Sequence, residues 1–229
     1  NPKNRRLRSS ILVKSKKTSL IIDATPDLRQ QLLSTNVQYL DGILITHTHS
    51  DHINGIDDFR FLNVLMKSEI NLYATKKNLK KINERFGYVF EKLHPEANGF
   101  FYKPCLIPNE ISGKFKINEF EITALSQNHG YTVSTGFKIN NFAYCTDVCD
   151  FDDHVFKKLY NLDLWIIDCL RFKEHKTHAH FDKVMNWIEL LKPKKTILTH
   201  MNYEVDYDHI MSKVPKNCIA AYDGLKVKI

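Results

Sequence analysis

The sequence predicts an α/β fold in which helices lie outside two sheets, and three observations lead to that prediction. Short apolar and β-branched runs alternate with amphipathic helical segments along most of the chain. Polar side chains that can bind metals recur where predicted strands end. The chain has 229 residues, 43% hydrophobic and 26% charged, which suits one globular domain with a sizeable core. We therefore expect residues 1–229 to form a single domain.

The first half of the chain predicts a hairpin, then alternating helices and strands. The polar stretch Ser15-Lys16-Lys17 marks the hairpin turn, and Pro26 suits the first turn of a helix. Thr75 suits a helix N-cap, and Gly87 suits the C′ position that ends the same helix. The expected elements are strands at 11–13 and 19–22, a helix from 25 to about 33, a strand at 42–45, a helix at 58–65, a strand at 70–73 and the helix that Thr75 begins.

Residues 88–113 are aromatic and interrupted by Pro and Gly, which predicts an irregular insertion over a binding cleft. The second half then predicts mostly strands and one strongly amphipathic helix. That helix has apolar residues at helical spacing from Phe181 to Leu191, and Pro193 follows its end. The expected strands cover residues 114–117, 120–125, 134–139, 142–145, 164–167, 196–198 and 225–229.

The densest group of potential metal ligands follows the apolar run Ile43-Leu44-Ile45. His47, His49, Asp51 and His52 fall within six positions, on the predicted loop after a buried strand. In an extended or turning segment the first two histidines point the same way, and the last two residues come round on the next turn. Imidazole nitrogens and carboxylate oxygens suit zinc, manganese or iron. The segment therefore predicts a metal site.

Three further strand ends have metal-capable residues. His129 follows the strand at 120–125, Asp147 follows the strand at 142–145, and His200 follows the strand at 196–198. Ligand sites in sheet-based folds tend to lie along one sheet edge. Together with the first motif these residues provide seven ligands, enough for two metals with one bridging carboxylate and one position open for water.

The order HxHxDH, then His, Asp and His resembles the metallo-β-lactamase-fold hydrolase superfamily over nearly the whole chain. Two further segments resemble its branch of phosphonate-pathway cyclic phosphodiesterases, which is related to ribonuclease Z. These segments are Asp23-Ala24-Thr25-Pro26-Asp27-Leu28-Arg29 and Asn54-Gly55-Ile56-Asp57-Asp58. The resemblance implies a four-layer αββα sandwich. Members of this branch usually begin with a Gly-rich strand and loop, often with cysteines for a structural zinc. We expect that first strand to lie outside this chain.

The resemblance also implies a role for each ligand and a dinuclear site with two divalent ions, Zn²⁺ or Mn²⁺. One metal is expected on His47, His49 and His129, and the other on Asp51, His52 and His200, with Asp147 bridging. Such a site activates a water molecule for attack on phosphorus, and Asp51 is counted among the catalytic residues as well as the ligands.

A second histidine group, His175, His178 and His180, precedes the predicted helix at 181–191. His178 matches the position of a non-ligand histidine in the phosphodiesterase and ribonuclease Z branch, which implies a general acid to the leaving oxygen. For His175 we expect a solvated side chain, and for His180 a helix cap. Asp168 either orients a ligand histidine or is an ordinary strand-terminal residue.

The expected function is hydrolysis of a small phosphodiester or nucleotide, cyclic esters included. The alternatives are a ribonuclease Z-like RNA endonuclease, favoured by the net charge of +7, and thioester or lactam hydrolysis on the same fold. Nucleic acid is thus the second candidate partner after a small phosphate ester, and the resemblance implies a homodimer. Five scattered cysteines without a CxxC pair favour free thiols and a reducing, cytoplasmic compartment. No apolar run approaches the length of a membrane span.

Overall fold

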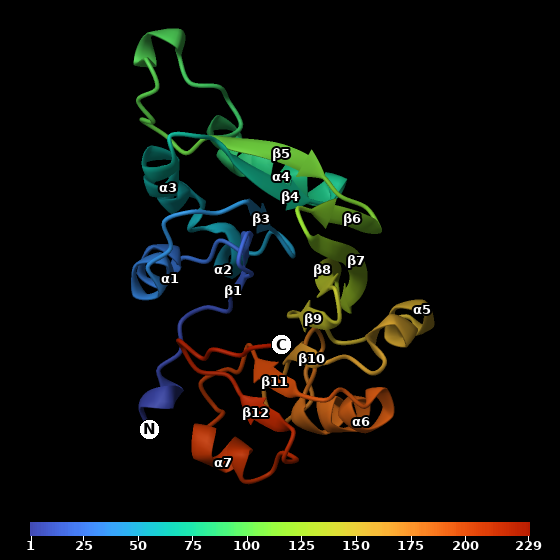
Figure 1. The fold of residues 1–229 in the computed structure, drawn as a ribbon. Coiled ribbons are helices and arrows are strands. Elements are labelled where there is room, and N and C mark those ends of the chain that lie inside the picture. Colours follow the sequence, from blue (N-terminus) through green and yellow to red (C-terminus); the bar gives the residue numbers. More distant parts are fainter. The chain divides into compact units, whose positions relative to one another are not determined.

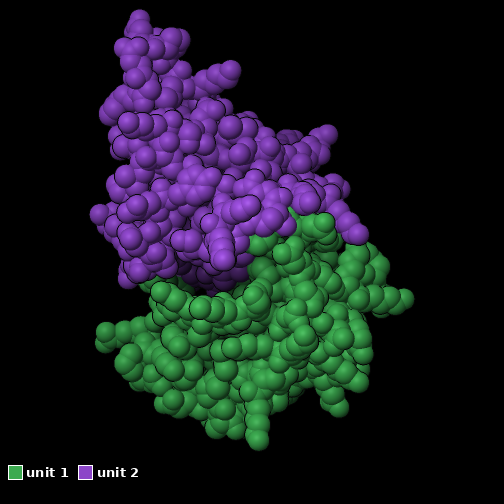
Figure 2. All heavy atoms as spheres, in the orientation of Figure 1, with its two compact units in different colours: residues 1–7, 120–229 green, residues 8–119 purple.

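The computed structural model describes residues 1–229, which form two compact units. Unit 2 comprises residues 8–119, and unit 1 combines residues 1–7 with residues 120–229 (Figure 2). The chain therefore passes twice from one unit to the other, after residue 7 and after residue 119. The single domain expected over residues 1–229 stays a prediction.

The sheet of unit 2 has the strand order β1-β2-β3-β4-β5 (Figure 1). β1 and β2 form the predicted antiparallel hairpin, with Ile11 opposite Ile22, and the other neighbours are parallel. The residues of β2 and β3 are buried throughout, as expected for apolar strands covered on both faces. The strands are β1 (Ile11–Lys14), β2 (Ser19–Ile22), β3 (Gly42–Leu44), β4 (Ile70–Ala74) and β5 (Leu106–Glu110), and β6 (Lys114–Ile117) follows them in the chain.

The helices of unit 2 bury one face in a core with Ile43, Leu72 and Ala74 of the sheet. The predicted N-cap is confirmed: the Asn78 amide donates to Thr75 Oγ1 over 3.4 Å at the start of α4. Gly87 is not a left-handed C′ residue, because its φ is −50° and the chain continues into a 3₁₀ turn. The elements are α1 (Leu28–Thr35), α2 (Ser50–Ile53), η2 (Ile56–Asp58), α3 (Phe59–Met66), α4 (Lys76–Phe86), η3 (Gly87–Val89) and η4 (Pro95–Ala97).

The irregular insertion predicted over residues 88–113 is wrong for part of this range, because the range contains β5. β5 pairs in parallel with β4 and is the last strand of its sheet. Pro108 is tolerated there because an edge strand has one row of backbone groups without sheet partners. The residues between α4 and β5 extend away from the sheet of unit 2 as a long connection (Figure 1).

The sheet of unit 1 places β7 to β12 in the order β12-β11-β10-β9-β8-β7. β7, β8 and β9 are antiparallel, and the remaining pairs are parallel. The predicted strand at 120–125 begins at the correct residue, Phe120, but β7 continues as far as His129. The strands are β7 (Phe120–His129), β8 (Thr132–Ile139), β9 (Phe142–Cys145), β10 (Leu164–Asp168), β11 (Thr196–Thr199) and β12 (Cys218–Ala220).

The predicted helix at 181–191 is confirmed as α6 (Phe181–Leu191), whose apolar face packs on the sheet of unit 1. At the centre of this core, Phe151 lies with its ring centroid 5.1 Å from Trp187 and 6.3 Å from Trp165. The closing strand expected at 225–229 is wrong, since β12 forms the sheet edge and 225–229 are partly or fully exposed. The remaining elements are η1 (Pro2–Asn4), α5 (Asp153–Phe156), η5 (Lys157–Leu159) and α7 (Tyr207–Met211).

None of the helices combines the length and the apolar character that crossing a membrane requires. The thiols of all five cysteines are free.

Candidate metal-binding site

In unit 2 the predicted metal motif forms a compact histidine loop, residues 46–52, directly after β3. His47 Nε2 lies 2.9 Å from His49 Nδ1, and the rings of His47 and His52 are 4.3 Å apart at their centroids. α2 begins at Ser50, so Asp51 and His52 come round on its first turn as expected. His47 and His52 are buried. Imidazole nitrogens and the Asp51 carboxylate thus converge within one loop.

Asp23 anchors this loop through hydrogen bonds, a role that the sequence did not predict. Its carboxylate is fully buried and accepts hydrogen bonds from the Thr46 amide (2.8 Å), the Thr46 hydroxyl and His52 Nδ1 (2.8 Å). Because Nδ1 of His52 is engaged, Nε2 is the nitrogen left for a metal, and it lies 3.6 Å from Asp51 Oδ2. Burial raises the pKa of Asp23, while the neighbouring His52 opposes that rise.

The backbone of the loop is also tied to α4. The Asn78 side chain donates to the Thr46 carbonyl over 3.2 Å, and the Arg85 guanidinium donates to the Thr48 carbonyl over 2.6 Å. These bonds satisfy loop carbonyls that no strand partner reaches. The loop is therefore preorganised by side chains on both sides of it.

In unit 1 the predicted ligands His129 and His200 and the predicted general acid His178 lie around the buried carboxylate of Asp147. We call these four residues the Asp147 cluster. Asp147 Oδ1 lies 3.6 Å from His129 Nε2, and Oδ2 lies 3.4 Å from His200 Nε2. Both separations exceed a good hydrogen bond. They are close to the spacing of about 3.3 Å between two ligands of a tetrahedral metal with bonds of 2.0–2.1 Å. The donor set and its spacing therefore fit a divalent metal.

Two residues of this cluster adopt left-handed backbone conformations at strand ends. Asp147 has φ 53° after β9, and His200 has φ 59° after β11. In unit 2, Asp23 has φ 69° after β2. A left-handed residue turns the chain sharply, which directs its side chain away from the path that a continued strand would give it. Each of these three strand ends thus supplies one polar side chain to the candidate site.

His129 is oriented by the loop that precedes α6. Its Nδ1 lies 2.7 Å from the Thr177 carbonyl, to which it donates when protonated, so Nε2 faces Asp147. The next residue favours glycine: Gly130 has φ 70°, and a Cβ there would lie 2.5 Å from Thr177 Cγ2, so that the neighbouring side chain would have to shift. This close approach fixes the distance between the end of β7 and the loop.

Asp168 holds His178, a partner that neither of the two alternatives for this carboxylate named. Asp168 Oδ2 lies 2.7 Å from His178 Nδ1 and also accepts the Val148 amide over 3.1 Å. Asp168 therefore orients His178 rather than one of the expected ligands. Its other oxygen, Oδ1, is buried without a hydrogen-bond partner. Burial raises the pKa of Asp168, and the hydrogen bond from His178 opposes that rise.

His178 lies inside the cluster, with its Nε2 3.9 Å from Asp147 Oδ1 and its ring stacked on His200 at 5.0 Å. One donor atom each of Asp147, His178 and His200 lies within 4.8 Å of the others. His175 is exposed, as expected, but its ring centroid lies only 5.2 Å from that of His178. His180 is the N-cap residue of α6, although its side chain makes no capping hydrogen bond.

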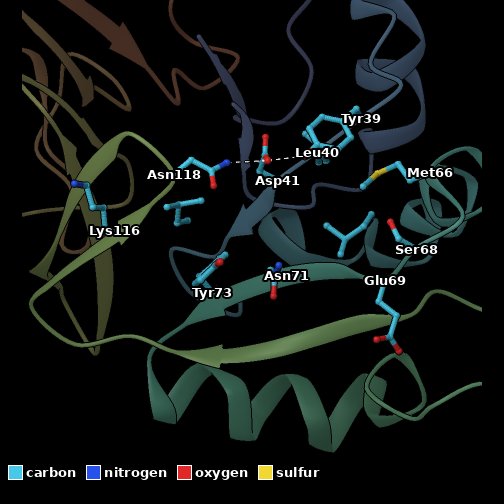
Figure 3. A pocket seen from close by; sticks show the side chains of 12 residues that line it. Tyr39, Leu40, Asp41, Met66, Ser68, Glu69, Asn71, Tyr73, Lys116 and Asn118 are labelled. Atoms are coloured by element: carbon cyan, nitrogen blue, oxygen red, sulfur yellow. Dashed lines mark hydrogen bonds between the residues drawn. The ribbon is translucent and has the colours of Figure 1, made fainter. Parts of the chain in front are cut away.

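A separate hollow of about 400 Å³ in unit 2 contains none of the predicted ligands (Figure 3). Asp41 lines the hollow and accepts hydrogen bonds from the Tyr39 hydroxyl (2.6 Å) and the Asn118 side-chain amide (2.9 Å). The hollow borders the first residues of β4, whereas the histidine loop follows the last residue of β3. Its lining includes no imidazole, so it is not the candidate metal site.

Comparison with known proteins shows the family. The family model described as "Beta-lactamase superfamily domain" matches residues 18–201. A solved structure described as a new diphosphatase from the PhnP family is 29% identical, with a TM-score of 0.89 over 99% of this chain and 85% of that one. The short form of human tRNase Z is 15% identical, with a TM-score of 0.72 over 97% of this chain and 92% of that one.

A curated relative from Porphyromonas gingivalis, described as an octanoyltransferase, is 29% identical over 99% of this chain. The chain spans 46% of that relative's length, so the name describes a protein about twice as long. The likeness to tRNase Z concerns the fold alone. The fold class predicted from the sequence is confirmed by the family match and the structural neighbours. The chain belongs to the β-lactamase superfamily and has the fold of its metallo-β-lactamase-type hydrolases.

Proposed function

We propose that this chain is a metal-dependent phosphodiesterase that cleaves a small phosphate ester or nucleotide, cyclic esters included. The observation that carries the proposal is the Asp168–His178 pair beside Asp147. A lone metal site needs no such pair, whereas cleavage of an ester needs a proton for the departing oxygen. The likeness to a diphosphatase, at 29% identity, also supports chemistry at phosphorus.

We propose two divalent metals, Zn²⁺ or Mn²⁺, held by seven residues. The ligand sets follow from the superfamily resemblance: His47, His49 and His129 for one metal, Asp51, His52 and His200 for the other, with Asp147 shared. When bound, such metals supply Lewis acidity, which lowers the pKa of water and offsets negative charge on phosphoryl oxygens.

The protein's own residues then hold ligands and move one proton. Asp23 fixes His52, and the Thr177 carbonyl fixes His129, each through Nδ1. Asp168 likewise engages Nδ1 of His178, which leaves Nε2 as the atom that delivers a proton to the leaving oxygen. A positioned general acid of this kind contributes about 10²- to 10⁴-fold to the rate.

The test combines metal analysis with a phosphodiester assay. Purified protein is loaded with zinc or manganese, its metal content is measured, and bis(p-nitrophenyl) phosphate and cyclic nucleotides are offered as substrates. We expect two metals per chain and turnover of at least one ester. A p-nitrophenolate group leaves without a proton, so His178→Ala should lower turnover of the cyclic nucleotide much more than that of the nitrophenyl ester.

His154→Ala is the matched control, because His154 lies on the same unit in α5, outside the Asp147 cluster. It should leave both rates unchanged. Fewer than two metals in active protein would overturn the dinuclear site, and equal loss on both esters would overturn the role of His178.

A second candidate is a ribonuclease Z-like RNA endonuclease. The net charge of +7 favours it, because phosphate contacts dominate affinity for nucleic acids. Cleavage of precursor tRNA under the same metal conditions tests it. Endonucleolytic cleavage at a rate well above that of any small ester would favour this candidate over the first.

We also propose that the protein acts as a homodimer in the cytoplasm, as the superfamily resemblance and the scattered free cysteines lead us to expect. Sedimentation equilibrium tests the dimer, and a monomer at micromolar concentration would contradict it. Fractionation of cells that express the natural protein tests the location.

A further inference from the structure

The turn that carries Asp147 leaves the sheet of unit 1 just after β9. β9 pairs with β8 from Phe142 to Tyr144, whereas β7 and β8 stay paired as far as His129 and Thr132. Asp147 then turns the chain sharply with φ 53°. Buried carbonyls in such a turn need hydrogen-bond partners that a sheet ladder does not supply.

Two buried polar side chains provide those partners. Gln127 and Ser134 lie opposite each other on β7 and β8, and their exposed fractions are 1% and 0%. The Gln127 side-chain amide donates one hydrogen bond to Ser134 Oγ and another to the Thr146 carbonyl, both over 2.9 Å. The Ser134 hydroxyl donates in turn to the Asp147 carbonyl over 2.7 Å. Each of the two consecutive carbonyls of the turn is therefore held by a side-chain donor.

These bonds fix the backbone angles of Asp147. The Thr146 carbonyl belongs to the peptide plane before Asp147 Cα, and the Asp147 carbonyl belongs to the plane after it. The only soft angles between two such planes are φ and ψ of the residue that joins them. The second plane is also held at its other side, where the Val148 amide donates to Asp168 Oδ2 over 3.1 Å. The left-handed conformation of Asp147 is therefore imposed by its surroundings.

The orientation of the Gln127 amide follows from its partners. If the amide group were reversed, Oε1 would face the Thr146 carbonyl, and two acceptors would meet. In the observed orientation Oε1 is buried without a hydrogen-bond partner, which is unfavourable by itself. Oε1 lies so close to Gly136 that a Cβ there would overlap it. The side chain is thus placed for its two donors rather than for complete hydrogen bonding of its own.

The same turn determines where the Asp147 carboxylate lies. Oδ1 is 3.6 Å from His129 Nε2, and Oδ2 is 3.4 Å from His200 Nε2. The Thr146 hydroxyl also donates to Oδ2 over 2.7 Å. Rotation about the backbone angles of Asp147 would move both oxygens relative to both imidazoles at once. A change in the turn should therefore affect any metal that the Asp147 cluster binds.

We propose that Gln127 and Ser134 are positioning residues of the metal site, which hold the turn so that the Asp147 carboxylate is ready to bind metal. This inference rests on the part of the proposed function that makes Asp147 a metal ligand. Without these bonds Asp147 can adopt commoner backbone conformations, and the conformation that binds metal becomes a fraction of the population. The apparent metal affinity falls by that fraction.

The experiment measures the zinc affinity of the full chain by chelator competition and the urea denaturation of the same chain without metal. Gln127→Met keeps the length of the side chain and removes both donors together with the unpartnered oxygen. We expect zinc to bind about 10- to 100-fold more weakly, as for other residues that orient a metal ligand. A tenfold loss corresponds to about 1.4 kcal/mol. The free energy of unfolding of the metal-free chain should fall by less, because an unsatisfied buried oxygen is removed as well.

Gly136→Ala gives a second measurement that leaves Gln127 itself unchanged. The new Cβ would displace the flexible end of the Gln127 side chain, so the amide would no longer reach both of its partners. Ser134→Ala removes the donor to the Asp147 carbonyl directly. Each of these two variants should also bind zinc about tenfold more weakly.

The matched control is Asn217→Leu, which removes a bond of the same kind elsewhere in unit 1. The Asn217 side-chain amide donates to the Pro193 carbonyl over 3.1 Å, just before β12 begins. Gly87→Ala is the control for the glycine substitution, because a Cβ there would make only ordinary contacts. Both controls should keep the zinc affinity of the unsubstituted chain.

Unchanged zinc affinity in Gln127→Met and Gly136→Ala overturns the positioning role. A loss of stability in the metal-free chain that equals the loss of binding free energy overturns it too, because the residues would then act on the fold alone. An equal loss of affinity in the controls has the same meaning. If the variants weaken zinc binding as expected but the metal-loaded protein hydrolyses no phosphodiester, the proposed phosphodiesterase fails and the positioning role stands.

Discussion

Replacing Asp168 by asparagine tests the role of the Asp168–His178 pair most directly. The substitution keeps the shape of the side chain and removes its charge. In the structure one oxygen of Asp168 serves both His178 Nδ1, at 2.7 Å, and the Val148 amide, at 3.1 Å. The amide oxygen of asparagine can take over both bonds, and its NH₂ group then occupies the place of Oδ1, which has no partner. The fold should therefore persist.

The expected loss concerns catalysis. A hydrogen bond to a charged group contributes about 1.5–3 kcal/mol, against about 1 kcal/mol for a neutral one. The imidazolium of His178 would lose that difference when it acts as an acid. The difference is about 0.5–2 kcal/mol, so we expect kcat on a cyclic nucleotide to fall about 2- to 30-fold, since 1.4 kcal/mol corresponds to a factor of ten. KM should change by less than about threefold, because the pair acts on the proton and not on binding.

Steady-state kinetics on a cyclic nucleotide measure the change, and chemical denaturation checks the fold. Asp168→Ala gives the contrast: it leaves the Val148 amide and His178 Nδ1 without their acceptor, at a cost of about 1–3 kcal/mol each. Unchanged kcat in the asparagine variant would refute the reasoning. A loss of kcat accompanied by an equal loss of bound metal would place Asp168 among the residues that hold the metals instead.

Three further predictions concern packing and metal binding. Gly130→Ala should destabilise the protein by about 1–3 kcal/mol in urea denaturation, because the new Cβ would meet Thr177 at 2.5 Å and the residue has φ 70°. Gly113→Ala is the control: this residue also has a positive φ but lies in open space, so the substitution should cost only about 1 kcal/mol. Asp23→Asn should weaken zinc binding about 10- to 100-fold in chelator competition through its loss of the charged bond to His52, and wild-type affinity would contradict that. Removing metal with a chelator should lower the melting temperature and abolish ester hydrolysis, with recovery of both on adding zinc or manganese.

The histidine loop and the strand-end ligands could be predicted because their patterns are local. His47, His49, Asp51 and His52 lie within six positions, so spacing alone indicates a shared site. The partner of His52 could not be found in this way. Asp23 lies 29 residues earlier in the chain and is brought to the loop only when β2 and β3 pair in parallel.

The errors in the predicted strands have a similar origin. Residues 225–229 alternate apolar and charged side chains in the manner of a half-buried strand. That alternation does not show whether a neighbouring strand is available for pairing. The true edge strand, β12, is only Cys218–Ala220, and it is held by parallel pairing with β11. β5 could not be predicted because it contains Pro108 and Asn109, and proline and asparagine are rare in strands. An edge position tolerates them.

The left-handed residues at the strand ends have a consequence for the energetics of the protein. Asp23, Asp147 and His200 adopt a left-handed backbone conformation, which costs a residue with a side chain about 1 kcal/mol or more relative to glycine. Glycine at any of these positions would relax the backbone, and the same exchange would remove a polar group from the candidate site. Selection for stability alone would therefore tend to erase the site. The chain therefore carries backbone strain at these three positions together with the polar side chains placed there, and ligands bound to those side chains would offset that strain.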